Sequence, residues 1–282
     1  MKRIFTLCVA VCTFMTSFAQ TDSTGKPSPD TIRIGGMVII REGGNNNNNE
    51  DSTRKRDRIF RINRRNNEKP ANVSTNWWIL DLGFANWSDK TNYSSLEAQS
   101  FAPGANEDNL KLRSGKSRSV NIWIFMQRLN LIKHTVNLKY GLGVELNNYH
   151  FENKETMFTK NPTIVDIDGY AALNPSKNKL AADYLTVPVM LNFNFTPNNK
   201  RAYGFSAGVS AGYLYSSRQK TKADGDVDKV KSDFNLRKWK LSYVGEVSLG
   251  IVKLYGSYAI KGLFEDGLDM TPYTVGFRFS NW

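Results

Sequence analysis

The sequence of 282 residues is poor in the side chains on which most enzymes rely, with only two cysteines and two histidines. Both cysteines, Cys8 and Cys12, lie within the first twenty residues, so a chain that loses this segment has no disulfide and no thiolate metal site. Two histidines provide too few ligands for a typical catalytic metal site. The sequence also contains no nucleotide-binding or nucleophile-elbow motif. We therefore expect no enzyme, no metal and no cofactor.

Long apolar runs are also missing, which argues against a helical membrane protein. Hydrophobic residues make up 40% of the chain, below the roughly 45–50% of ordinary globular proteins, whereas aromatic residues reach 12%. A chain this rich in aromatic residues is not disordered throughout. The formal net charge of +12 raises the question of a nucleic-acid partner.

Residues 1–19 have the parts of a secretory signal peptide. Lys2 and Arg3 form the positive start, Ile4–Met15 forms a short apolar core, and small residues lead to cleavage after Ala19. The predicted export answers the question raised by the net charge. An exported chain meets little nucleic acid, so we expect no nucleic-acid partner.

The mature chain begins with a polar, low-complexity segment, residues 20–73. One apolar island within it, residues 31–40, has the length of a short strand or a small hairpin. A basic block follows, formed by Arg54, Lys55, Arg56, Arg58, Arg61, Arg64 and Arg65. We interpret residues 20–73 as a solvated periplasmic tether. The alternative is that residues 41–69 bind an acidic envelope partner or anionic lipid headgroups.

From residue 74 to residue 282 apolar and polar side chains alternate with a period of two, the pattern of half-buried strands. Eight such runs occur, at residues 77–84, 120–127, 136–147, 185–195, 202–215, 239–249, 252–261 and 273–280. We expect each of them to cross a bilayer, which takes roughly 9–11 residues of a tilted strand. In the first two runs we expect Trp78 and Met126 to point outward and Trp77 to point inward.

The connections between the runs alternate between long and short. The long polar connections are residues 88–117, 152–181, 221–235 and, shorter than these, 265–270. The tight connections are residues 131–133, 197–201 and 250–251. Long loops at one end and short turns at the other are typical of outer-membrane barrels. The sequence thus predicts an eight-stranded antiparallel up-and-down transmembrane β-barrel, preceded by the tether, in the outer membrane of a Gram-negative bacterium.

Alternation alone does not separate this barrel from a soluble one, so the composition of the polar face decides. That face carries small residues such as Gly204, Gly208 and Gly212, which fit the crowded lumen of an eight-stranded barrel. Aromatic residues near the strand ends resemble the girdles at a membrane interface. We predict this girdle to contain Trp78, Tyr213, Tyr215, Trp239, Tyr258 and Tyr273. A diffusion porin is excluded, because an open channel needs about 16–18 strands.

The same alternation turns charged residues into the lumen. The predicted lumen network contains Asp81, Lys139, Glu145, Lys240, Glu246, Lys253 and Arg278, with Lys261 beside them. Buried charges are tolerated only when they are paired, so we expect ion pairs that plug the barrel. The alternative, a proton or ion path, is disfavoured in a lumen this full of side chains.

Four segments resemble the PorT-like outer-membrane β-barrel proteins of Bacteroidetes. They are the signal end Phe18-Ala19-Gln20, the strand Tyr184–Val189, the glycine-rich strand Gly204–Tyr213 and the terminal Val275–Phe279. The resemblance covers roughly residues 76–282 and implies an outer-membrane location and insertion by the barrel assembly machinery. It supplies no catalytic residues. At least one member of this family is linked to protein secretion.

Three functions remain open. The first is a non-enzymatic barrel with a structural, adhesive or assembly/secretion-accessory role through its long outer loops or its basic tether. The second is a rim enzyme acting on lipid or peptide, for which His150 at the outer end of its strand is the candidate base, since His134 lies at the periplasmic end. The third is a soluble exported ligand-binding barrel.

Overall fold

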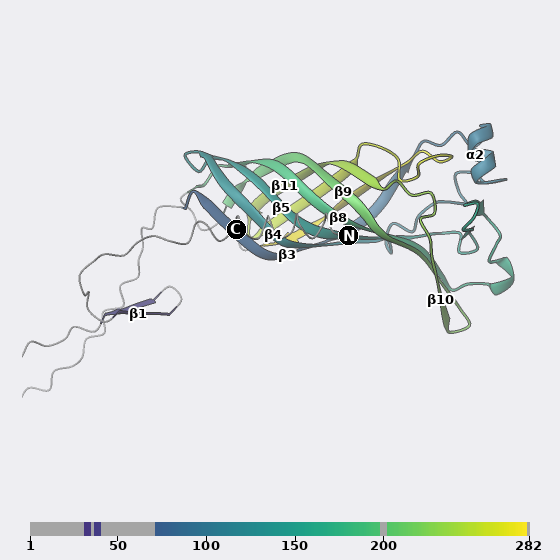
Figure 1. Ribbon diagram of the computed structural model, residues 1–282, viewed down its shortest axis with the longest axis horizontal. Coiled ribbons are helices and arrows are strands. Elements are labelled where there is room, and N and C mark those ends of the chain that lie inside the picture. Colours follow the sequence, from purple (N-terminus) through teal and green to yellow (C-terminus); the bar gives the residue numbers. More distant parts are fainter. Residues whose placement is uncertain (1–30, 35–36, 41–70, 198–201, 281–282) are drawn as a thin grey trace, which may run out of the picture. The chain divides into compact units, whose positions relative to one another are not determined.

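The computed structural model describes residues 31–34, 37–40, 71–197 and 202–280 (Figure 1). The chain divides into two compact units, Met1–Lys69 and Pro70–Trp282. In the first unit, β1 (Thr31–Ile34) and β2 (Met37–Ile40) pair antiparallel, so the apolar island forms a small hairpin. The predicted signal peptide and the basic block lie outside the described residues.

The second unit is a closed barrel, which confirms the predicted fold class. Its eight strands are β3 (Val73–Asp89), β4 (Arg118–Ile132), β5 (Val136–His150), β8 (Lys177–Asn194), β9 (Ala202–Ala223), β11 (Trp239–Gly250), β12 (Val252–Ala259) and β13 (Met270–Phe279). Each strand pairs antiparallel with the next, and β13 pairs with β3 to close the sheet. Closure satisfies the backbone groups of every strand edge, as a bilayer requires.

The two faces of the barrel differ in the way that the alternation predicts. On β8, the outward-facing Leu185, Val187 and Val189 are each 44% exposed, whereas the inward-facing Thr186 is fully buried. An apolar outer face over most of the strand length is the surface that a barrel presents to lipid. Among the described residues, no helix is long and apolar enough to cross a membrane.

A bulge interrupts the alternation on β3 and β4. Trp77 pairs with Phe125 and Ile79 pairs with Trp123, while Trp78 between them has a φ of 56°. The register of β4 against β5 also shifts between Trp123 and Phe125. An extra residue in a strand reverses the side on which later residues point.

Because of this bulge, two of the predicted orientations are wrong. Trp77 and Trp78 are both exposed on the outer face, although Trp77 was expected to point inward. Met126 is fully buried on the inward side, although it was expected to point outward. A further prediction fails at the end of β12, because this strand stops at Ala259 and leaves Lys261 exposed in the following loop rather than in the lumen.

The connections are long at one end and short at the other, as expected. The long connections contain α2 (Leu96–Phe101), β6 (Met157–Phe158), β7 (Val165–Asp166), the 3-10 helix η1 (Ala171–Leu173) and β10 (Asp226–Lys231). The strand β10 extends the end of β9 as a hairpin, and both α2 and β10 lie beyond the same end of the barrel (Figure 1). We call this long-loop end the outer end and define the cap as residues 90–117, 151–176, 224–238 and 260–269.

Candidate functional site

The middle of the lumen is crossed by two Lys–Glu pairs between β5 and β11. The Nζ of Lys139 lies 2.7 and 2.6 Å from the two carboxylate oxygens of Glu246, and Lys240 pairs with Glu145. All four side chains are buried. On each strand the lysine precedes the glutamate by six residues, and the two strands run in opposite directions. Each lysine therefore faces the glutamate of the opposite strand.

A third pair joins the first and last strands of the barrel. Arg278 on β13 donates two hydrogen bonds to Asp81 on β3, each with a nitrogen–oxygen distance of 2.7 Å. These two residues are also direct register partners. Arg278 pairs in addition with Glu246, and the indole Nε1 of Trp123 donates to Asp81 Oδ2 at 2.7 Å. The two-point geometry of a guanidinium on a carboxylate is the strongest form of such a contact.

The structure thus brings six of the seven predicted lumen residues into ion pairs and places the seventh, Lys253, nearby. Lys253 Nζ donates to the backbone carbonyl of Ser280 at 3.3 Å. Two cavities beside these charges measure about 20 Å³ each. A cavity of about 10–15 Å³ or more holds one water, so neither space is a channel.

The charged layer is lined by aromatic rings that were not among the predicted site residues. The guanidinium carbon of Arg278 lies 5.5 Å from the ring centroid of Trp123 and 5.8 Å from that of Tyr255. The Nζ of Lys240 lies 4.7 Å from the ring centroid of Tyr184. These distances fit cation–π contacts, which gain strength where water is excluded.

Above the charged layer the lumen is filled by a hydrophobic cluster that continues into the cap. Barrel residues Trp87, Tyr149 and Tyr184 belong to it. The cap contributes buried phenylalanines, namely Phe101, Phe151, Phe158, Phe234 and Phe264. Their rings are in contact, with centroid distances of 5.6 Å for Phe101–Phe264 and 6.0 Å for the stacked Phe158–Phe264 pair. The outer loops therefore share one core instead of projecting separately.

Polar side chains tie the cap to the barrel beneath it and tie the cap loops to one another. Gln219 on β9 accepts a hydrogen bond from the backbone N–H of Phe158 at 3.0 Å and donates to the carbonyl of Thr156 at 2.9 Å. Arg237 donates to the carbonyls of Gly262 and Phe264 at 3.2 and 3.1 Å. Buried polar groups satisfied in this way fix the loops in one arrangement.

The predicted girdle residues lie near the ends of the strands. Tyr213, Tyr215, Trp239, Tyr258 and Tyr273 lie toward the outer end, and all are exposed on the lipid face except the half-buried Tyr273. The rings of Tyr213 and Trp239 are 5.0 Å apart. Trp78 is at the opposite end, where the bulge places Trp77 beside it on the same face.

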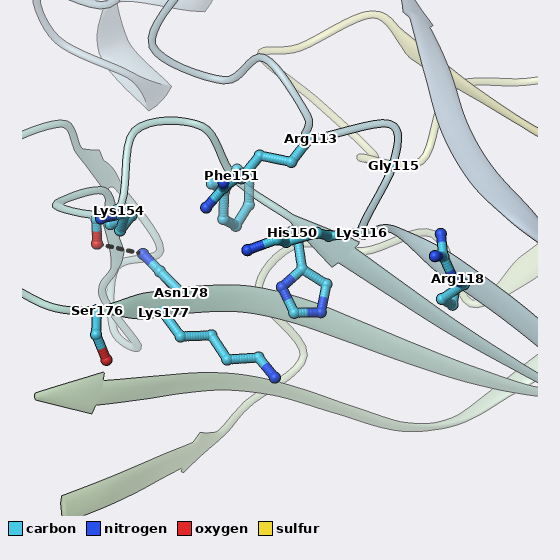
Figure 2. A pocket seen from close by; sticks show the side chains of 10 residues that line it. All are labelled: Arg113, Gly115, Lys116, Arg118, His150, Phe151, Lys154, Ser176, Lys177 and Asn178. Atoms are coloured by element: carbon cyan, nitrogen blue, oxygen red, sulfur yellow. Dashed lines mark hydrogen bonds between the residues drawn. The ribbon is translucent and has the colours of Figure 1, made fainter. Parts of the chain in front are cut away.

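A pocket of about 390 Å³ opens at the outer end of β4, β5 and β8. It is lined by Arg113, Gly115, Lys116, Arg118, His150, Phe151, Lys154, Ser176, Lys177 and Asn178. Figure 2 shows cationic side chains on several sides of the His150 imidazole. The pocket is therefore strongly positive, and no acidic side chain lines it among the described residues.

His150 lies in this pocket beyond the apolar part of β5, while His134 is in the short turn at the other end of the strand. Burial, together with the neighbouring Lys177 and Lys179, lowers the pKa of His150 to about 4. Such an imidazole is neutral and only weakly basic at pH 7. The one hydroxyl among the described residues of the pocket lining, Ser176 Oγ, donates to the backbone carbonyl of Lys222 at 3.1 Å.

The barrel region matches a known protein family. A family model described as outer membrane protein beta-barrel domain matches residues 80–265. No curated protein sequence matches the chain significantly. Two crystal structures of Ail, the attachment invasion locus protein of Yersinia pestis, are similar, one of them in complex with the heparin analogue sucrose octasulfate. Each has 11% sequence identity and covers 73% of this chain and 98% of Ail, with TM-scores of 0.30 and 0.29.

The family match covers most of the chain and includes all or part of seven of the eight strands of the closed barrel described above. The protein is therefore located in the outer membrane of a Gram-negative bacterium, which excludes the soluble exported barrel. The chain belongs to the outer membrane protein beta-barrel domain family.

Proposed function

We propose that this protein is a non-enzymatic, non-conducting outer-membrane barrel that acts through its cap, in a structural or adhesive role outside the cell. The observation that carries the proposal is the continuous core of the outer end. Trp87 and Tyr149 of the barrel and Phe158 and Phe264 of the loops belong to one buried cluster. Loops ordered before binding lose less entropy when a partner attaches, so an ordered cap is suited to recognition.

The lumen and the rim support the non-conducting and non-enzymatic parts of this proposal. The Lys–Glu pairs and the Asp81–Arg278 pair occupy the middle of the barrel, where a pore would run. At the rim, Ser176 is engaged with a backbone carbonyl, and His150 is surrounded by cations. A nucleophile with a hydrogen-bonded base, which a rim hydrolase requires, is not found among the residues lining the described pocket.

Site-specific photo-crosslinking in the native membrane tests the proposal. A photo-reactive amino acid replaces Leu96, which is 91% exposed on α2 of the cap, and in a matched variant it replaces Ile251, which is 84% exposed in a short turn at the opposite end. We expect a discrete adduct from position 96 and none from position 251. An adduct that forms only at position 251 contradicts an extracellular role and moves the function to the periplasmic side.

The assembly or secretion-accessory role is the second candidate, and it rests on the basic block Arg54–Arg65 together with the PorT-like resemblance. In this version the partner is a periplasmic or envelope protein that binds residues 41–69. Crosslinking is repeated with a chain that lacks residues 20–73 but retains its signal peptide. Loss of every adduct on this deletion supports the tether, whereas adducts that persist at position 96 support the cap.

A further inference from the structure

The outer rim of the barrel has two chemically different halves. On β9, β11, β12 and β13 the outward side chains near the outer end are aromatic, as at Tyr213, Trp239 and Tyr258. On β4, β8 and the far end of β9 they are cationic. We call this second set the cationic ledge; it consists of Arg118, Lys177, Lys179, Lys220 and Lys222, together with the neutral imidazole of His150 on β5.

The ledge begins where the apolar surface stops. On β8 the exposed Leu185 is followed toward the outer end by the Asp183 position and then by Lys179 and Lys177. On β9, Tyr213 and Tyr215 are followed by Arg218 and then by Lys220. A side chain at this height lies beside the lipid headgroups, immediately outside the hydrocarbon layer.

Strand pairing holds the cations of the ledge next to one another. Lys177 is the register partner of Lys222, and Lys179 is the partner of Lys220 on one side and of the neutral His150 on the other. Like charges directly opposite each other on a sheet destabilise it. The pKa of Lys179 is lowered by burial and by the neighbouring Lys177 and Lys220.

In the described part of the chain, no carboxylate forms an ion pair with these lysines. Asp183, the nearest carboxylate on the same strand, is paired with Arg218. Lys179 donates to a neutral oxygen, Asn148 Oδ1, at 2.5 Å. No ion pair among residues 71–197 and 202–280 involves Lys177, Lys220 or Lys222. A surface with this repulsion is stabilised by an anion from outside the chain.

The pocket at the outer end adjoins the ledge and adds further cationic side chains to it. Arg113 and Lys116 from the first long connection and Lys154 from the second line it together with Arg118, His150 and Lys177. Its volume of about 390 Å³ is within the roughly 300–1,000 Å³ typical of small-ligand sites. Arginine and lysine are the side chains that bind phosphate oxygens, the first through paired hydrogen bonds and the second as a point charge.

We propose that the cationic ledge and the adjoining pocket bind the phosphate groups of a phosphorylated saccharide lipid in the outer leaflet. The position of the ledge at the headgroup level favours a lipid over a soluble anion. Basic pockets on membrane proteins bind phosphorylated headgroups in the same manner. The inference concerns the lipid-facing wall of the barrel and does not depend on the proposed role of the cap.

The test uses the full-length protein in nanodiscs and a diphosphorylated glucosamine-disaccharide glycolipid as the probe, with binding measured by native mass spectrometry. The ledge variant changes Lys177, Lys179, Lys220 and Lys222 to Gln. A control variant with the same loss of charge changes four exposed lysines elsewhere, Lys90, Lys133, Lys160 and Lys261, to Gln. Heat-modifiable gel mobility shows that each variant is a folded barrel.

We expect the ledge variant to bind the glycolipid at least tenfold more weakly than the wild type and the control variant to bind it equally well. Removal of both phosphates from the glycolipid should weaken wild-type binding to the same extent. Equal binding by the ledge variant and the wild type, or by the glycolipid with and without phosphates, overturns the proposal. Inorganic phosphate competing at the concentration of the glycolipid also overturns it, because the site would then serve a soluble anion.

The imidazole of His150 gives a second readout. Bound phosphate offsets the cations that lower its pKa, so the NMR titration of His150 should move upward when the phosphorylated glycolipid is added. The dephosphorylated glycolipid should leave the titration unchanged. An unchanged titration with the phosphorylated form contradicts binding in the pocket.

Discussion

At the residue scale, the lumen is organised by charge reciprocity. Lys139 and Glu145 on one strand face Glu246 and Lys240 on another that runs the opposite way. Each ammonium group loses its hydration on burial, and the ion pair with a carboxylate compensates for this loss. Removing one partner of a buried pair is costly because it leaves an uncompensated charge, typically about 3–5 kcal/mol.

Charge reversal at one pair tests this reciprocity. We expect Glu145→Lys to destabilise the barrel by about 3–5 kcal/mol, because two ammonium groups then face each other inside the lumen. The double variant Glu145→Lys with Lys240→Glu should regain most of the loss. Full recovery is not expected, because the contact of Lys240 with the Tyr184 ring is removed.

Urea unfolding in lipid vesicles, followed by tryptophan fluorescence, measures both variants against the wild type. If the double variant is no more stable than Glu145→Lys alone, the two residues do not act as a pair. Glu265→Gln, at an exposed position of the cap, serves as the control and should change the unfolding midpoint little.

The sequence predicts the face on which a charged residue lies but not its partner. Alternation by two is enough to turn Glu145 and Lys240 inward. Their contact, in contrast, depends on the tilt and stagger of strands separated by 95 positions along the chain. For the same reason the pocket around His150 was not foreseen, because its lining comes from three strand ends and two loops that only the closed barrel brings together.

At the scale of the element, the bulge on β4 depends on a glycine of the neighbouring strand. A Cβ added at Gly143 would lie 2.6 Å from the carbonyl oxygen of Ile122 and 2.7 Å from both Cα and Cε3 of Trp123. These contacts are too short to be tolerated without movement. Trp123 is the residue that donates its indole N–H to Asp81.

We therefore expect Gly143→Ala to displace Trp123 and to destabilise the barrel by about 1–3 kcal/mol, the usual cost of overpacking. The matched control is Gly245→Ala, where the nearest atom to an added Cβ is 3.8 Å away. Vesicle unfolding midpoints and the tryptophan emission maximum measure the effect. Equal midpoints for the two variants would show that Trp123 relaxes without cost.

The cap has a comparable close contact between two of its loops. Gly267 has a φ of 83°, and a Cβ added there would lie 2.4 Å from the Cβ of Phe101 on α2. We expect Gly267→Ala to separate α2 from the last loop and to expose residues 94–105 to protease. The barrel itself should stay folded, because the ion pairs of the lumen are not touched.

Limited proteolysis with heat-modifiable gel mobility measures both parts of this expectation. Gly225→Ala is the control, since Gly225 has a similar φ of 93° but no atom within 4 Å of an added Cβ. It separates backbone strain from the clash with Phe101. Identical digestion of the two variants would show that the contact does not hold α2 in place.

Element ends and interruptions are the parts of the fold that alternation does not reveal. A bulge changes which face later residues occupy without changing composition, so Trp77 and Met126 were assigned to the wrong sides. The alternation does not predict the core of the cap, for a different reason. Phe158 and Phe234 stand in connections without any period, and only their three-dimensional proximity makes them a core.

At the scale of the whole molecule, the lumen is closed twice, by the charged layer and by the hydrophobic cluster above it. We expect the reconstituted protein to give no discrete conductance steps in planar bilayers, where a sixteen-stranded porin serves as the positive control. The Gly267→Ala variant should also give no conductance steps, because opening the cap leaves the charged layer intact. Resolved steps from the wild type would contradict a plugged barrel.

The bond between Asp81 and Arg278 has a consequence for the order in which the molecule is completed. These residues belong to the first and the eighth strand of the barrel, so the carboxylate receives its guanidinium only after all the strands between them exist. A chain halted one strand early exposes an unpaired sheet edge and buries Asp81 without its counter-charge. The pairing of β13 with β3 that closes the barrel therefore also makes an incomplete barrel unstable, because Asp81 then lacks its partner.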